Sequence, residues 1–495
     1  MYRLRKILLL GSMIAVYVFF SIFSIADEYF EEKEEKGSEE SENFPAHSGN
    51  IPVVQITTKS GSLSYIESDK ENFESGFITI LSEDGDPVYY GQLDRMKGRG
   101  NTSWDAPKKS YSLKLASEAS LLGMESAQDW ILSADYYDGA YIRNSLGFWL
   151  ADRVGLEYVA DSRFVDLYVN GEYRGLYELM ERIELEEGRI PVLDGWLLEM
   201  DYPERAIYEE NVLYLENGQP VVIHEPENVS YREMEALEDW FMEMEKALYA
   251  DDYINPDTGK GIFEYLDLES FARKYLLEEV FLNMDMGVTS HYLYMDESGK
   301  LYEGPPWDLD NAMGRGNYDE DELLLLQGDP SRNQMLRWYI RLCGNDTFYE
   351  TVLREWEDNM YPALQEIEDE VDELLEPLEA SIQMDQERWP GSRSMTMPNT
   401  DLDYNVSFLK EYLSERTELL YQAFSVDSQK TKERFQDRMD EMPEEMVIEP
   451  YEEEREEVES FSVKEYLFAG HGMIALFLLL MVMILLIVAD RRRNG

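Results

Sequence analysis

Alternating apolar and polar positions predict that the first part of the chain folds mostly into β-strands. The run "PVVQITT" and the segment "FITILSEDGDPVYYGQL" show the period of two that is typical of half-buried strands, and the second predicts a hairpin that turns at "DG". "RFVDLYVNGEYRGLYELMER" predicts another hairpin, turning at "NG", and "GWLLEMD" a short buried strand. A helix over residues 139–155 interrupts these strands.

Beyond about residue 228 the pattern changes to a helical one. "SYREMEALEDWFMEMEKALYA" and "DLESFARKYLLEEVFLNMD" carry apolar residues at spacings of three and four, and residues 346–388 and 402–424 continue in the same way. We therefore expect an α+β fold with a β-rich N-terminal lobe and a helical C-terminal lobe. Such an architecture often holds a ligand between its lobes.

Both ends of the chain carry hydrophobic segments long enough to span a bilayer. Residues 7–26 follow basic residues and are interpreted as a membrane anchor or a signal peptide, and residues 467–489 precede three arginines and predict a membrane helix. Because basic residues mark the cytoplasmic side, the part between the two segments should lie outside the cytoplasm. We expect a protein of the cell membrane with an extracytoplasmic body and a cytoplasmic C-terminus.

Acidic, polar stretches separate the hydrophobic ends from a folded body. The expected parts are a signal peptide or anchor (1–26), an acidic linker (27–50), an N-lobe (about 51–200), a C-lobe (about 201–425), a second acidic linker (426–464), a membrane helix (467–489) and a basic tail (490–495).

Charge and cysteine content exclude several kinds of protein. The formal net charge is −59, whereas nucleic-acid binding needs a basic surface, so we expect basic or cationic partners and no nucleic acid. Cys343 is the single cysteine, so no intramolecular disulfide can form, and with four histidines a structural zinc site is not expected. Any metal site should be built from carboxylates.

Two aspartates stand one residue apart in "GPPWDLDNAMG" (304–314). In an extended segment, Asp308 and Asp310 would point the same way and repel each other unless a cation lay between them. Carboxylate oxygens suit Mg²⁺ or Ca²⁺. The alternative is a surface pair of aspartates in a turn.

A lysine-containing strand is expected in "KGRGNTSWDAPKKSYSLKL" (97–115), where Arg99 lies between two glycines. Alternation from Pro107 onward would place Lys109 with the apolar residues, pointing inward, and Lys108 on the other face. An inward lysine needs an anionic partner, either a phosphate chain or a carboxylate. The alternative is that Lys109 reaches solvent at the edge of the lobe.

A further carboxylate, that of Asp285, precedes the aspartate pair by about 20 residues. A predicted helix ends at Asn283-Met284-Asp285, and a predicted hairpin then leads to Asp308. In phosphoryl-transfer sites one carboxylate accepts the substrate proton and another holds the metal that bridges the phosphates. The alternative to a phosphoryl-transfer site is that Asp285 only caps the helix and Asp308 only forms a turn.

The ordered set of motifs resembles the CotH kinase family, atypical kinases named for spore coat protein H. The matching segments are "RGN" with "PKKSYSLKL", "LGM…DWILSADYYDGAYIRN", "YVNGEYRGLYELME", "NMD" and "GPPWDLDNAMG", which span about residues 51–425. The resemblance implies an atypical protein-kinase-like two-lobe fold that binds ATP with Mg²⁺ or Mn²⁺. It also implies transfer of the γ-phosphoryl group to Ser or Thr of extracytoplasmic, cell-envelope or spore-coat proteins.

The resemblance also implies roles for individual residues. Asp285 would be the catalytic aspartate, Asp308 the metal-binding aspartate and Lys109 the lysine that grips the phosphates. Further candidates are Arg99 at the cofactor, Asn283 and Asp310 at the metal, and Glu181 or Glu199 as the partner of the lysine. Two other functions stay open: a non-catalytic kinase-like surface module for adhesion or envelope assembly, and a small-molecule or glycan kinase.

Overall fold

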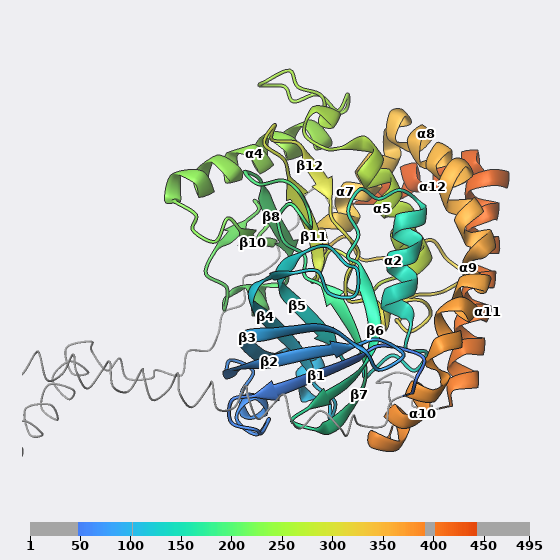
Figure 1. The fold of residues 1–495 in the computed structure, drawn as a ribbon. Coiled ribbons are helices and arrows are strands. Elements are labelled where there is room, and N and C mark those ends of the chain that lie inside the picture. Colours follow the sequence, from blue (N-terminus) through green and yellow to red (C-terminus); the bar gives the residue numbers. More distant parts are fainter. Residues whose placement is uncertain (1–47, 101, 392–400, 443–495) are drawn as a thin grey trace, which may run out of the picture. The chain divides into compact units, whose positions relative to one another are not determined.

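The computed structural model describes residues 48–100, 102–391 and 401–442 (Figure 1). Within this part a β-rich N-terminal region is followed by a mostly helical C-terminal region, as the hydrophobic pattern predicts. The mixed α+β class is therefore confirmed for the described residues.

The N-terminal strands close into a barrel. Their order around it is β1 (Val53–Thr58), β2 (Phe73–Leu81), β3 (Pro87–Arg99), β4 (Ser110–Ala119), β5 (Ala127–Ser133), β7 (Glu172–Glu181) and β6 (Ser162–Val169). Parallel pairing of β1 with β6 closes the barrel, and the other neighbours are antiparallel. Inward side chains such as Ile56, Leu113 and Trp130 fill the interior, so the barrel is a packed core.

Both hairpins predicted for the N-terminal part of the chain are confirmed. β2 and β3 turn over residues 82–86, which include Asp84-Gly85. β6 and β7 turn at Asn170-Gly171, whose φ angles of 54° and 79° are those that a tight two-residue hairpin turn requires.

A five-stranded sheet lies beside the barrel. Its order is β12 (Leu301–Glu303), β11 (His291–Met295), β8 (Trp196–Met200), β10 (Pro220–Glu225) and β9 (Val212–Tyr214). The strand predicted over 195–201 is therefore confirmed as β8. Because β8 pairs with strands that follow it by up to about 100 residues, this sheet crosses the lobe boundary expected near residue 200.

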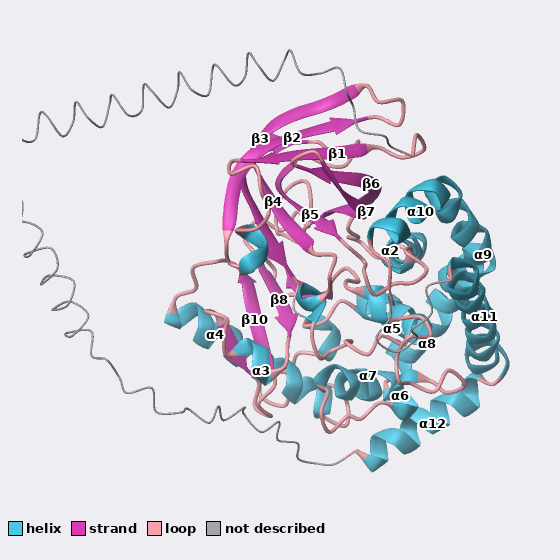
Figure 2. Cartoon of the chain, turned by 90° about the horizontal axis from the view of Figure 1, so that it is seen from below, coloured by secondary structure: helices cyan, strands magenta, loops and turns pink. Residues whose placement is uncertain are grey.

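Helices form the rest of the molecule. They are α2 (Arg143–Arg153), α3 (Pro203–Ala206), α4 (Tyr231–Tyr249), α5 (Leu268–Phe281), α6 (Leu324–Gln327), α7 (Gln334–Gly344), α8 (Asp346–Glu355), α9 (Tyr361–Leu375), α10 (Glu379–Arg388), α11 (Leu402–Tyr421) and α12 (Ser428–Glu441). Figures 1 and 2 show α9 and α11 on the side opposite β3 and β4. The largest apolar core lies mostly among the helices and includes most of the buried apolar residues of α5 and α7.

The folded body continues past its expected end at residue 425. α12 begins at Ser428, inside the segment expected to be an acidic linker, and Phe435 is fully buried against the rings of Tyr275 and Tyr349. A strongly charged helix can still be anchored by one large apolar side chain, because the other faces remain in water. The described part of the fold therefore includes α12.

Neither predicted membrane segment can be compared with the structure. Residues 7–26 and 467–489 lie outside the described residues. Among the residues that are described, no helix combines the length and apolar character that crossing a bilayer requires.

Candidate active site

The two adjacent aspartates lie in a turn that follows β12. Asp308 has φ 60° and ψ 53° and precedes a short 3-10 helix, η4 (Leu309–Asn311), which contains Asp310. The extended conformation expected for this pair is therefore wrong, because the backbone reverses at Asp308. We call residues 308–313 the acidic loop.

The acidic loop concentrates negative charge. Burial raises the pKa of Asp310 well above its usual value, and the charges of Asp308 and Asp135 add to the effect. Solvent reaches Asp308, yet the protein packed around it raises its pKa too. The two carboxylates thus interact strongly although they do not lie on an extended strand.

Asp285 lies in the loop after α5, which ends at Phe281 and is followed by Leu282 in the left-handed conformation. The side chain of Asn283 accepts a hydrogen bond from the Asp285 N–H at 3.1 Å, so Asn283 shapes this loop. Burial, followed by the charge of Asp308, raises the pKa of Asp285 to about 6, and Arg205 opposes the shift. The predicted hairpin, now β11 and β12, does bring the end of α5 to the acidic loop.

Two arginines provide positive charge at this site. Arg99, at the end of β3, lies with its guanidinium carbon 5.5 Å from the centre of the Trp307 ring. Burial lowers the pKa of Arg99, and the charge of Asp308 is among the influences that oppose this. Arg205, in α3, pairs with Asp201 at 3.6 Å. Sequence reasoning missed Arg205, because nothing in its short helix marks it as functional.

Glu199 holds the loop next to Asp308. Its carboxylate accepts the N–H of Ser290 at 2.8 Å and contacts His224 at 2.7 Å. The hydroxyl of Ser290 donates to Asp308 at 3.4 Å. Burial alone would raise the pKa of Glu199, but the contacts with His224 and Ser290 bring it below its usual value.

Neither glutamate proposed as a lysine partner has that role in the structure. Glu199 pairs with His224, and Glu181 pairs with Arg189 at 2.7 Å on another part of the barrel. The ammonium of Lys109 instead donates to the backbone oxygen of Trp104 and lies 4.7 Å from the centre of its ring.

The expected orientation of the two lysines is wrong. Lys108, not Lys109, is buried: its ammonium donates to the carbonyl oxygens of Ala134 and Leu176 and lies 3.1 Å from Asp385 of α10. β4 begins only at Ser110, so both lysines precede the strand and its alternation does not apply to them. Lys108 therefore anchors α10 to the barrel.

More carboxylates lie behind the acidic loop. The charges of Asp135 and Asp138 both raise the pKa of Asp310. Asp138 pairs with Arg143 and lies 3.7 Å from Arg315, so its own charge is compensated. The motif "SADYYDGAYIRN" carries Asp135, Asp138 and Arg143; sequence reasoning identified Arg143 as a candidate for phosphate contact, loop ordering or a structural salt bridge but missed the two aspartates.

The arrangement favours a cation that binds together with phosphate. The charge of Asp308 acts on both Asp285 and Asp310, but within the described ranges no group of three or more acidic, histidine or cysteine side chains is placed to hold a metal ion. Mg²⁺ commonly binds through one or two carboxylates and completes its shell with water and substrate phosphates. The residues present fit that mode.

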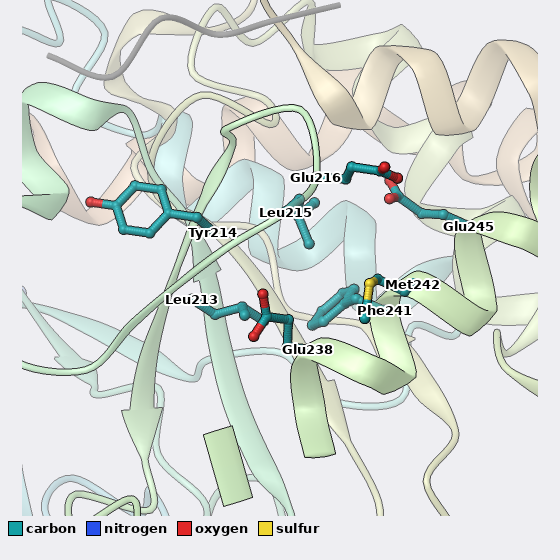
Figure 3. A pocket seen from close by; sticks show the side chains of 8 residues that line it. All are labelled: Leu213, Tyr214, Leu215, Glu216, Glu238, Phe241, Met242 and Glu245. Carbon is teal, nitrogen blue, oxygen red and sulfur yellow. The ribbon is translucent and has the colours of Figure 1, made fainter. Parts of the chain in front are cut away.

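A separate groove lies between β9 and α4 (Figure 3). The residues that line it include the apolar Leu213, Leu215 and Phe241 and the acidic Glu216, Glu238 and Glu245. It shares no residue with the group around Asp285 and Asp308.

Comparison with known proteins identifies one family. Residues 96–420 of the 495 match a family model described as CotH kinase protein. The matched range contains Arg99, Asp285 and the acidic loop. No curated protein matches the chain.

Proposed function

The chain belongs to the CotH kinase protein family, and on this premise we propose that it transfers the γ-phosphoryl group of ATP to serine or threonine hydroxyls of proteins, with Mg²⁺ or Mn²⁺. Family membership implies kinase activity and the use of ATP. The protein acceptor, the metal and the roles of individual residues are our proposal. We further propose that the acceptors are extracytoplasmic proteins of the cell envelope or spore coat.

The convergence of Asp285 and Asp308 supports this proposal best. The hydrogen bonds and ion pairs of the described residues do not involve the Asp285 carboxylate, so it is available to a substrate. A pKa raised to about 6 leaves it mostly ionised at neutral pH and basic enough to accept a proton from a hydroxyl. Asp285 would therefore act on the acceptor.

Asp308 and the two arginines would bind the phosphates. A bound divalent cation bridges phosphate oxygens and offsets the charge that develops on them. Asp308 would hold this cation, with Asp310 as a second ligand. We assign Arg99 and Arg205 to the phosphate oxygens, because guanidinium groups bind phosphate well and the Lys109 ammonium is already held by Trp104.

Labelled ATP and purified protein, with Mg²⁺ or Mn²⁺, test the proposal. Asp308→Ala should weaken both metal-dependent ATP binding and phosphoryl transfer. Asp285→Asn should leave ATP binding nearly intact and slow transfer by about 10²–10⁴-fold, the usual contribution of general base catalysis. Asp296→Asn is the matched control, because Asp296 lies in the β11–β12 turn and is held by Ser298.

The outcome distinguishes the proposed kinase from a non-catalytic module. If Asp285→Asn and Asp308→Ala bind metal and ATP like the parent, and the parent transfers no phosphate, the aspartates serve another purpose and the proposal fails. Transfer to sugars or small molecules with no transfer to protein would instead support the alternative acceptor class.

Asp310→Asn tests whether Asp310 is a metal ligand. Burial and neighbouring charge raise the pKa of Asp310, and asparagine has nearly the same size and shape as aspartate, so the amide should be tolerated structurally. We expect weaker metal affinity that high metal concentration partly restores, with little loss of stability. A loss of stability without metal rescue would show that Asp310 only orders the loop.

We also propose that the body lies outside the cytoplasm, anchored by residues 467–489. The basic residues that flank both hydrophobic segments support this topology. Protease added to intact cells should digest the body and spare a C-terminal tag. A body protected in intact cells would refute it.

A further inference from the structure

The backbone of the acidic loop has an unusual conformation that requires external support. Asp308 adopts left-handed angles, which residues other than glycine keep only where the surrounding structure supports them. The next residue, Leu309, supplies one of the amides through which the loop is attached to the rest of the protein. Its N–H donates to the side-chain oxygen of Asn144 at 2.8 Å.

Asn144 is itself held in one orientation. It lies in the first turn of α2 and is buried, and its amide nitrogen donates to Asp135 at 2.9 Å. An acceptor on one side and a donor on the other allow only one placement of the oxygen and nitrogen of the carboxamide. Asp135 is fixed in turn by the hydroxyl of Ser133 at 2.8 Å.

The same face of α2 receives the side chain of Leu309. Gly147 follows Asn144 by three residues and so lies on the same side of the helix. A Cβ atom at Gly147 would lie 2.0 Å from Leu309 Cδ1, so glycine leaves the room that Leu309 fills. α2 therefore contacts Leu309 twice: Asn144 binds the backbone N–H of Leu309, and the space at Gly147 accommodates the Leu309 side chain.

Arg143, the neighbour of Asn144, fixes the far end of the loop. Its Nε donates to the carbonyl oxygen of Ala312 at 3.1 Å, and Asp138 holds its guanidinium. Asn144 binds the Leu309 amide, which lies between Asp308 and Asp310 in the chain.

We propose that Asn144 is a positioning residue that sets the orientation of Asp308 and Asp310 through the backbone amide of Leu309. This inference rests on the proposed function, in which Asp308 holds the metal. Asn144 acts through Leu309 and need not touch the substrate. Residues that orient metal ligands from behind commonly contribute about 10–100-fold to metal affinity or activity.

The test compares the full-length protein with Asn144→Ala and a matched control, Asn255→Ala. Asn255 is also buried, accepts two backbone amides through its side chain and donates to a carbonyl, but it lies in the turn between α4 and α5. We expect both variants to lose stability to a similar extent. Only Asn144→Ala should raise the dissociation constant for Mn²⁺ in the presence of ATP, by about 10–100-fold.

A charge-conserving exchange provides a rescue. Combining Asn144→Asp with Asp135→Asn keeps an acceptor facing the Leu309 amide and exchanges donor and acceptor on the other side. We expect the dissociation constant of this double variant for Mn²⁺ to lie within about threefold of the parent value. Asn144→Ala, in contrast, should raise it about tenfold or more. Failure of the exchange to improve on Asn144→Ala would count against the proposal.

Amide hydrogen exchange of Leu309 separates this inference from the proposed function. Asn144→Ala should accelerate exchange at Leu309 whether or not the protein is an active kinase, and Asn255→Ala should not. Faster exchange in a protein that transfers no phosphate would leave the positioning role standing and remove the kinase proposal. Unchanged exchange at Leu309 and unchanged Mn²⁺ affinity in Asn144→Ala would overturn the positioning role.

Discussion

Replacing Lys108 should destabilise the fold strongly, whereas replacing Lys109 should not. The side chain of Lys108 is fully buried, and its ammonium lies 3.1 Å from the equally buried carboxylate of Asp385. It also donates to the carbonyl oxygens of Ala134 and Leu176. Lys108→Ala would remove the cation and leave Asp385 inside the protein.

The expected loss follows from this burial. Removing one partner of a buried ion pair costs about 3–5 kcal/mol, because the other charge remains without its counter-ion. Asp385 keeps the hydrogen bond from the Leu176 N–H at 3.0 Å, which offsets part of the cost. Lys109→Ala removes one backbone hydrogen bond and one ring contact with Trp104, worth about 1–2 kcal/mol together.

Urea unfolding followed by tryptophan fluorescence measures both losses. With a slope of about 3 kcal/mol per molar urea, Lys108→Ala should lower the midpoint by about 1–1.7 M and Lys109→Ala by about 0.3–0.7 M. Lys108→Met combined with Asp385→Leu should recover most of the loss, since apolar residues can replace a buried ion pair. Equal shifts for the two lysines, or no recovery in the double variant, would refute the reasoning.

Three further changes test other parts of the fold. Burial raises the pKa of Glu178 to about 8, so the folded state holds this proton more tightly than the unfolded state does. The resulting contribution to stability should be present below about pH 4.5 and fall as the pH rises to about 8, by at most about 1.4 kcal/mol per pH unit. Urea unfolding of Glu178→Gln at a series of pH values should lack this slope. Gly147→Ala should displace Leu309 and lower Mn²⁺–ATP affinity more than about tenfold in a binding titration, while changing the unfolding free energy by less than about 2 kcal/mol. Phe435→Ala should cost about 3–5 kcal/mol in denaturant unfolding if α12 belongs to the fold, and less than about 0.5 kcal/mol if it does not.

Local patterns predicted the elements whose signals are local. Turn dipeptides and alternation identify the hairpins around Gly85 and Gly171, and helical spacing identifies α4 and α5. A hairpin separates Asp285 from Asp308 along the chain. Because the two strands of a hairpin are antiparallel, the end of the second strand lies beside the start of the first, which predicts that the two aspartates lie close together.

Features that depend on tertiary contacts were not predictable in the same way. The lysine orientation depended on where β4 begins, and a start at Ser110 removes the basis of the alternation. Arg205 reaches the site only because β8 and β10 place α3 there, and no periodicity encodes that pairing. The left-handed backbone of Asp308 precedes Leu309, whose N–H is bound by Asn144 of α2, 165 residues earlier in the chain.

The charges of the site explain why nucleotide and cation would have to bind together. At Asp310 the charges of Asp308, Asp135 and Asp138 act against that of Arg315, and the chain as a whole carries −59. Free ATP would meet like charge on approach and at the site. A divalent cation would offset this repulsion, because carboxylate and phosphate oxygens are both suitable ligands for such an ion. Nucleotide binding should therefore depend more on Asp308 than on any lysine.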